Sequence, residues 1–350
     1  MEQQKKPAKI LMKQKIMRRV LLALLPCVAG AVYFFGWRCL FLAVWAAVTG
    51  FAVEYIFTHR RNEPVSEAVF VTTTIFTLIM PPSVPLHVLT IGVIFAVMFT
   101  KEIFGGFGRN IFNPAMAGRC FIYVCFPVAL TSTWKAPAAG IWGALKSWTT
   151  VTSAEAVTGA TPMAYLKAGS MVLSSESDAT TKVPFDISEG QVVEVNRNSF
   201  LKALAFGRIS GTAGVTSAIL ILIGGIYLFI TKTASRAIIL SVIISYALLS
   251  HILYMFGVRP VNDALVSLMG GGFLFGAFFM ATDPVSAPKT ETAKIFYGII
   301  ISIFTVIIRN FSVFNGGLMF AILLGNMFAP ILDYAVISYK TGKTTVERVQ

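Results

Sequence analysis

The segment Thr158-Gly159-Ala160-Thr161 is the part of this sequence best suited to a covalent modification. It lies in a long hydrophilic interruption of an otherwise apolar chain. A threonine hydroxyl with Gly and Ala as neighbours is sterically open, so the active site of a modifying enzyme can reach it. Small residues are common in loops, however, so the segment alone does not indicate a covalent modification, and the rest of the sequence has to support it.

A second polar segment combines glycines with asparagines, from Gly105-Gly106-Phe107-Gly108-Arg109-Asn110 to Asn113-Pro114. No strand pattern precedes the glycines, which excludes a dinucleotide-binding loop. The side chains of Asn110 and Asn113, with open backbone N–H groups beside them, could bind a flavin or quinone ring. Asn113 could equally cap a helix that has Pro114 at its first position, and the two roles are compatible.

Four carboxylates lie in strongly apolar surroundings, namely Glu54, Glu67, Asp283 and Asp333. A carboxylate at membrane depth costs about 2.5–3.5 kcal/mol on insertion scales, which makes each one a candidate for a cation pathway. That role is favoured for Asp283 and Asp333, less for Glu67 and least for Glu54. The alternative for Glu67, Asp283 and Asp333 is a helix cap or a partner for Lys or Arg.

The cysteines do not form a metal-binding pattern. Cys27, Cys39, Cys120 and Cys125 sit in apolar segments without Cys-x-x-Cys spacing, so we expect them to be small hydrophobic residues. We therefore predict no metal site and no catalytic residue within this chain.

The composition places all of these residues in a membrane. The chain has 350 residues, of which 56% are hydrophobic and 13% charged, and its mean hydropathy is +0.74. About 20 apolar residues cross the hydrocarbon core as a helix, because the backbone must satisfy its own hydrogen bonds in lipid. We predict an all-α integral membrane protein with ten transmembrane spans, at residues 20–36, 38–57, 65–80, 84–100, 115–131, 212–231, 235–256, 263–281, 293–311 and 316–338.

The net charge of +13 follows a membrane topology and does not indicate a nucleic-acid surface. Lys and Arg gather before the first span, on alternate connections and in the C-terminal tail, whereas the intervening short loops hold almost none. This positive-inside pattern predicts cytoplasmic N and C termini. The loop 132–211 then lies on the extracytoplasmic side, with a short helix expected at Pro162–Ala168 because of its leading proline.

The two membrane halves look like copies of each other. The first carries Met80-Pro81-Pro82-Ser83-Val84-Pro85, and the second carries Met280-Ala281-Thr282-Asp283-Pro284 at the corresponding place. Five spans per half would relate the halves by inversion, and sites in such folds lie near the midplane, where short, broken helices such as the third and eighth spans meet. The predicted regions are a basic N-terminus 1–19, repeat 20–131, the loop 132–211, repeat 212–338 and a tail 339–350.

Together these motifs resemble one family of membrane flavoprotein subunits. The family holds the B subunit of the Na⁺-translocating NADH:quinone oxidoreductase and, as a close second match, the D subunit of the Rnf complex, a ferredoxin:NAD⁺ oxidoreductase. The matching segments, in chain order, are VSEAVFVT from Val65, KEIFGG from Lys101, NPAM from Asn113, TGAT from Thr158, MATDPVSA from Met280, FAIL from Phe320 and the stretch from Phe328 to Tyr334.

The resemblance implies that Thr161 carries FMN through a phosphoester bond, attached by a separate flavin transferase. Thr158, Gly159 and Ala160 complete the acceptor motif. Glu155 stands where the motif of the family has Asp, which keeps the charge and lengthens the side chain.

The resemblance also implies a non-covalent riboflavin, a quinone site near the cytoplasmic side, and Na⁺ handling at positions that match Glu67, Asp283 and Asp333. It implies a bacterial inner membrane and a complex with further membrane, flavin and iron–sulfur subunits. The chain would pass electrons from FMN through riboflavin to quinone, coupled to cation export, without an NADH-binding fold of its own. Two other interpretations stay open: a redox-inert channel or solute transporter, and a scaffold that only anchors partners.

Overall fold

The computed structural model describes residues 10–349 except 133, 139, 151–160, 175–182, 185–186, 189 and 315–316. Most of the described residues are helical. The first membrane half contains α1 (Lys15–Phe35), α2 (Arg38–Arg61), α3 (Ala68–Leu78), α4 (Leu86–Val97), the π-helical turn η1 (Met98–Glu102) and α5 (Pro114–Cys125). The second half contains α9 (Ala218–Ile230), α10 (Arg236–Met255), α11 (Ala264–Met269), α12 (Phe273–Phe275), the π-helical turn η2 (Gly276–Met280), α13 (Glu291–Phe311) and α14 (Gly317–Val349).

Five of the described helices are long and apolar enough to cross a membrane: α1, α2, α10, α13 and residues Gly317–Thr341 of α14. The chain is therefore a multi-pass membrane protein. Each of the ten predicted spans falls on helical residues. The spans outside the five long helices contain only shorter helices. The helix α3 has 11 residues, a rise of about 16 Å, whereas the hydrocarbon core is about 30 Å thick.

The third predicted span holds one short helix and the eighth is broken, as their prolines and glycines suggested. The helix α3 ends three residues before Pro81, and proline cannot donate a hydrogen bond to a helix. In the second half, α11 and α12 are separated by the glycines 270–272, and η2 ends just before Asp283.

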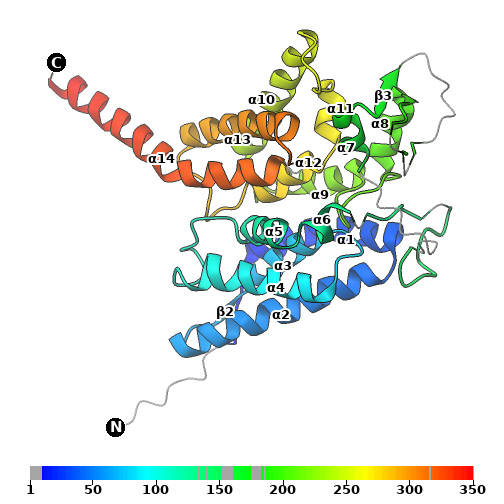
Figure 1. Ribbon diagram of the computed structural model, residues 1–350. Coiled ribbons are helices and arrows are strands. Elements are labelled where there is room, and N and C mark those ends of the chain that lie inside the picture. The colour runs from blue at the N-terminus through cyan, green and yellow to red at the C-terminus, as the bar shows by residue number, and fades with distance from the viewer. Residues whose placement is uncertain are drawn as a thin grey trace.

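The helices pack in two layers that correspond to the two halves. Figure 1 shows α2, α3, α4 and α5 below α10, α13 and α14. Within each half the fourth helix packs on the second and the fifth, so α4 contacts α2 and α5, while α13 contacts α10 and α14. Across the halves α1 packs on α9, where Gly224 leaves no room for a side chain: a Cβ atom there would lie 2.0 Å from the carbonyl oxygen of Ala23. Small residues of this kind allow membrane helices to approach closely.

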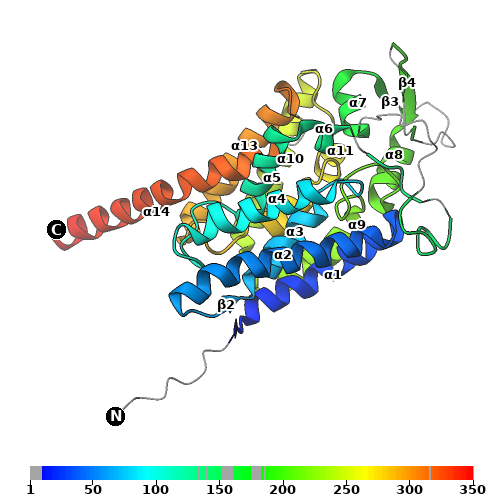
Figure 2. The same cartoon turned by 60° about the horizontal axis from the view of Figure 1, so that its bottom comes forward.

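The insert between the halves lies at one end of the helices. The short helix α6 (Pro127–Thr131) follows α5 and leads into the insert, which contains α7 (Pro162–Ala168), β3 (Met171–Ser174), β4 (Val193–Asn196) and α8 (Arg197–Phe206). Figures 1 and 2 both show these green elements at the right, whereas α1 begins and α14 ends toward the left. The insert is therefore at the opposite end of the helices from the start of α1 and the end of α14.

Two features of the insert and the N-terminus differ from the sequence prediction. The sequence predicted a loop with one short helix, but the insert has a small core in which Phe200, Val195 and Leu204 are almost fully buried. These residues of β4 and α8 pack with Tyr165 of α7 and Met171 of β3, which lie earlier in the chain, and periodicity within one segment does not reveal such a contact. The all-α prediction also missed two short parallel strand pairs, β3–β4 and β1 (Leu11–Met12) with β2 (Val65–Ser66). The short helix predicted at Pro162–Ala168 is confirmed as α7.

Candidate functional site

Thr161 is the residue immediately before α7, with its backbone extended and Pro162 at the first helical position. Its carbonyl oxygen accepts hydrogen bonds from Ala164 N at 2.7 Å and Tyr165 N at 3.1 Å. Its side chain makes no capping bond to the helix, and the residue is half-buried. The hydroxyl is thus available for a bond to another group. The motif residues Glu155, Thr158, Gly159 and Ala160 lie outside the described residues.

Thr161 lines a pocket, here the Thr161 pocket, that extends from the insert to the contact between the two halves. The side chains that reach it from the first half include Ile79, Met116 and Arg119. Phe275 and Met280 reach it from the second half. Ile79, Met116 and Phe275 are almost inaccessible to solvent, so this end of the pocket lies deep in the protein.

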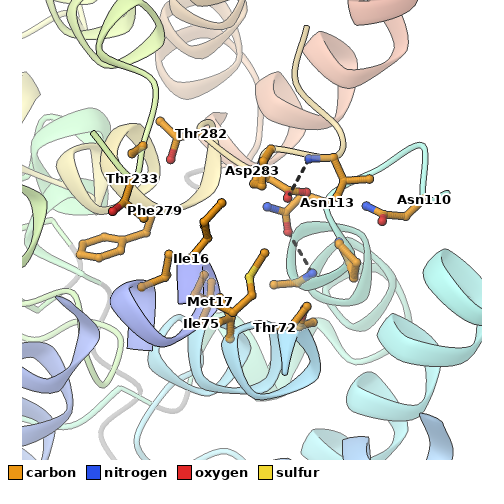
Figure 3. A pocket seen from close by; sticks show the side chains of 18 of the residues that line it. Ile16, Met17, Thr72, Ile75, Asn110, Asn113, Thr233, Phe279, Thr282 and Asp283 are labelled. Carbon is orange, nitrogen blue, oxygen red and sulfur yellow. Dashed lines mark hydrogen bonds between the residues drawn. The ribbon is translucent and has the colours of Figure 1, made fainter. Parts of the chain in front are cut away.

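A second pocket, here the Asp283 pocket, lies near the start of α1 and is shown in Figure 3. Asn110, Asn113 and Asp283 supply polar groups to it, while Ile16, Ile75 and Phe279 supply apolar walls (Figure 3). The structure therefore brings together three of the predicted site residues: the two asparagines and Asp283. A pocket with mainly apolar walls and a few convergent polar groups is typical of a small-molecule site.

Three helical elements, α3, η2 and α5, separate the two pockets. Ile75 of α3 lines the Asp283 pocket, and Ile79 lines the Thr161 pocket. Four residues along a helix correspond to about 6 Å. On α5 the neighbouring residues Ala115 and Met116 line one pocket each. The C-terminal ends of α3 and η2 and the N-terminal end of α5 form the wall between the two pockets.

Asn113 caps α5 and also ties the two halves together. Its Oδ1 atom accepts from Ala115 N at 3.0 Å and Met116 N at 3.3 Å, and its Nδ2 donates to the Met280 carbonyl at 3.1 Å. Asn326 of α14 accepts from Asn113 N at 3.1 Å. The capping role is thus observed, and ring binding by Asn113 stays a prediction. Asn110 Nδ2 donates to the Phe112 carbonyl at 3.0 Å.

The acidic residues predicted for a cation pathway do not lie at one site. The Asp283 carboxylate accepts from Ser286 Oγ at 2.8 Å and from Val285 N at 3.3 Å and faces the Asp283 pocket. Glu67 accepts from Arg18 Nε at 2.9 Å and Gln14 N at 2.7 Å, at the start of α3.

Asp333 accepts three hydrogen bonds from the loop before α13: from Lys289 N at 2.8 Å, Thr290 N at 2.9 Å and Thr290 Oγ1 at 2.8 Å. Asp333 and Glu67 therefore make the partner and capping contacts that were the alternative to cation handling. Their role in a cation pathway stays a prediction.

Several charged residues to which the sequence analysis assigned no role lie in the interior, and Lys101 and Arg119 are two of them. Lys101 is buried, and its Nζ atom contacts Glu54 Oε2 at 2.5 Å and Ser66 Oγ at 2.7 Å. Arg119 lies in the middle of α5 with a buried Nε atom that has no hydrogen-bond partner among the described residues. The signal for Arg119 was present, because it is a cation inside an apolar run.

Comparison with known proteins agrees with this architecture. Residues 9–342 match the model of the NQR2, RnfD, RnfE family. The chain belongs to this family. It is 34% identical over 315 residues to the B subunit of the Na(+)-translocating NADH-quinone reductase of Pseudoalteromonas atlantica, a match that covers 87% of this chain and 68% of that protein. It is also 34% identical over 331 residues to the D subunit of the ion-translocating oxidoreductase complex of Shewanella amazonensis, a match that covers 92% of this chain and 91% of the relative.

Proposed function

We propose that this membrane subunit of an ion-translocating oxidoreductase complex carries FMN covalently on Thr161 and passes electrons inward through riboflavin to quinone. The observation that carries the proposal is the position of Thr161. Its hydroxyl is not used to cap α7, and it lines a pocket that reaches the buried residues Met116 and Phe275. A flavin attached there through its phosphate could place its ring between the two halves. Flavins exchange electrons singly or in pairs, which suits a link between one-electron carriers and a quinone.

The Asp283 pocket supports a second ring-binding site on the other side of the wall. It offers the amides of Asn110 and Asn113 beside apolar walls. These are groups that could hold riboflavin or quinone by hydrogen bonds and ring contacts. Electrons would then cross the wall between the Thr161 pocket and the Asp283 pocket.

The proposed topology places the Thr161 pocket on the extracytoplasmic side. Ten spans in two inverted repeats would place both termini in the cytoplasm of a bacterial cell and the insert outside its inner membrane. The start of α1 and the end of α14 lie opposite the insert, which supports this arrangement (Figure 2). The electron donor would be a flavin of another subunit, and a flavin transferase would attach the FMN.

The proposed complex is the Na⁺-translocating NADH:quinone oxidoreductase, with cation export coupled to electron transfer through Asp283 and the other predicted carboxylates. The Rnf complex is the second candidate, because the D subunit from Shewanella amazonensis is as similar to this chain as the B subunit from Pseudoalteromonas atlantica. Purification of the native complex separates them: an FAD and iron–sulfur NADH dehydrogenase subunit in it supports the first assignment.

The test of the covalent flavin is a denaturing gel viewed under ultraviolet light. The chain, expressed with a flavin transferase, should give a fluorescent band that disappears in Thr161→Ala. The matched control is Thr131→Ala, since Thr131 lines the same pocket and its hydroxyl already donates to the Pro127 carbonyl at 2.8 Å. If the native protein gives no band, the channel or scaffold interpretation is favoured instead.

A further inference from the structure

Arg119 is a charged residue of the Thr161 pocket that the proposed function leaves without a role. Among the described residues, its buried Nε atom has no hydrogen-bond partner and no carboxylate forms an ion pair with it. An unpaired charge at membrane depth is costly, so such a residue usually serves a bound group.

The helix α5 presents Arg119 to the pocket between a buried end and a more open one. Met116, Arg119 and Tyr123 all line the Thr161 pocket, and their spacing of three and four residues places them on one face of the helix. Met116 is almost fully buried, whereas Tyr123 is half-buried. The side chain of Arg119 therefore lines the pocket between its buried end at Met116 and its more open end at Tyr123.

Arg309 is a buried arginine for which the protein itself supplies partners at one end of the guanidinium. Its Nη1 atom donates to Tyr246 OH at 3.0 Å and to the Ser267 carbonyl at 3.1 Å, whereas its Nη2 atom has no partner among the described residues. The side chain of Arg309 does not line the Thr161 pocket. Arg119 has no comparable contacts in the described part of the chain. The contrast indicates that its partner is a ligand of the pocket.

We propose that the Arg119 guanidinium binds the N1 and C2 carbonyl edge of the flavin ring tethered at Thr161 and stabilises the reduced, anionic flavin. This inference rests on the proposed function, because it needs the flavin on Thr161. It adds a residue that sets the redox equilibrium of that flavin.

The chemistry of flavin reduction explains why a guanidinium suits this edge. If FMN is bound, its reduction by two electrons with uptake of one proton at N5 would leave a negative charge on N1 and the C2 carbonyl oxygen, and Arg119 would be the cation next to that charge. A guanidinium presents parallel N–H donors that match two neighbouring acceptors, and a positive charge near N1 tunes the electronics of a flavin. The attraction is stronger in a water-poor pocket than in water. Arg119 neither gives nor takes the proton in this step.

The test is a redox titration of the flavin in the assembled complex. Other flavins of the complex are removed from the signal by subtracting the spectrum of Thr161→Ala. At the ambient potential where the wild-type flavin is half reduced, we expect the ratio of reduced to oxidised flavin to fall at least tenfold in Arg119→Gln. A tenfold change corresponds to about 30 mV for a two-electron couple.

Arg208→Gln is the matched control, because Arg208 is an exposed arginine of the insert next to Ile209, which lines the pocket. Its removal takes away the same charge, but solvent and salt screen it, so the ratio should not change. If Arg119→Gln does not accumulate in membranes, Arg119→Lys is titrated, with an expected decrease of threefold or more, because an ammonium cannot form the paired donors.

An unchanged ratio in a flavin-bearing Arg119 variant overturns the inference. An unchanged ratio together with a weaker fluorescent band also overturns the inference, because it would mean that Arg119 contacts the flavin phosphate and not the ring. The absence of a fluorescent band in the wild type is a different result, because it overturns the proposed function before Arg119 is tested.

Discussion

Asp283 is the carboxylate that the structure places in a pocket together with the predicted ring-binding asparagines, and its charge can be tested directly. We expect Asp283→Asn to raise the Na⁺ concentration needed for half-maximal quinone reduction at least tenfold, because an amide attracts a cation far less than a carboxylate does. The measurement is the Na⁺ dependence of quinone reduction by the complex. Glu291→Gln is the control. The Glu291 side chain is 75% exposed at the start of α13, and the substitution removes the same charge as Asp283→Asn does. Wild-type Na⁺ dependence in Asp283→Asn would exclude Asp283 from the pathway.

We expect the loss of one partner of the Lys101–Glu54 ion pair to lower the free energy of unfolding more than the loss of both partners. Both side chains are buried, and they are 2.5 Å apart. Removal of one partner leaves an unpaired buried charge, so Lys101→Met alone should lower the free energy of unfolding by about 3–5 kcal/mol. The double variant Lys101→Met with Glu54→Gln should recover most of this loss, as measured by unfolding in detergent.

The pair Lys294–Glu291, in which Lys294 is half-buried and Glu291 is exposed, provides the comparison for this cycle. Exposed pairs contribute about 0–1 kcal/mol, so Lys294→Met should leave the unfolding transition nearly unchanged. A double variant no more stable than Lys101→Met would mean that the two charges do not compensate each other.

At the scale of elements, the start of α5 should be more sensitive to mutation than an ordinary helix start. Loss of an asparagine cap costs about 1 kcal/mol. Asn113→Ala also removes the bond from Nδ2 to the Met280 carbonyl, so it should destabilise more than Asn196→Ala, which removes the cap of α8. Thermal unfolding of both variants tests this. Equal losses would show that the bond to η2 contributes nothing measurable.

Local signals in the sequence predicted some of these elements well. Asn113-Pro114 indicated a helix start, and α5 begins there with its asparagine cap. Pro162 likewise marked the start of α7. In both cases the signal and the structure it determines lie within a few residues, so no distant contact was needed.

The burial of Lys101 could not be read from the same kind of signal. A lysine that follows an apolar run and precedes a glycine-rich loop looks like a cytoplasmic anchor. Its partner Glu54 is 47 residues away, and the turn η1 carries the helix one turn beyond Val97 before the loop begins. The pairing therefore depends on how α2 and α4 pack. The pocket that joins Thr161 with Arg119 was hidden for the same reason, since distant segments of the chain meet there.

At the scale of the whole molecule, the predicted topology can be tested with single cysteines. A cysteine in place of the exposed Arg208 should react in intact cells with a maleimide that does not cross membranes. A cysteine in place of Tyr339, which is 76% exposed, should react only after the cells are opened. The native cysteines are replaced by alanine in both variants. The reverse pattern would invert the proposed orientation and move Thr161 to the cytoplasm.

The wall formed by α3, η2 and the start of α5 affects the passage of electrons and the passage of ions differently. Met116 and Ile79 are packed without exposure, so hydrated ions and solvent cannot follow this route. An electron needs no opening, since tunnelling falls off with distance and one helical turn of about 6 Å is short. With a ring on each face, the wall would let electrons pass while it blocks hydrated ions, so a cation that enters the Asp283 pocket would have to leave it by a route other than the Thr161 pocket.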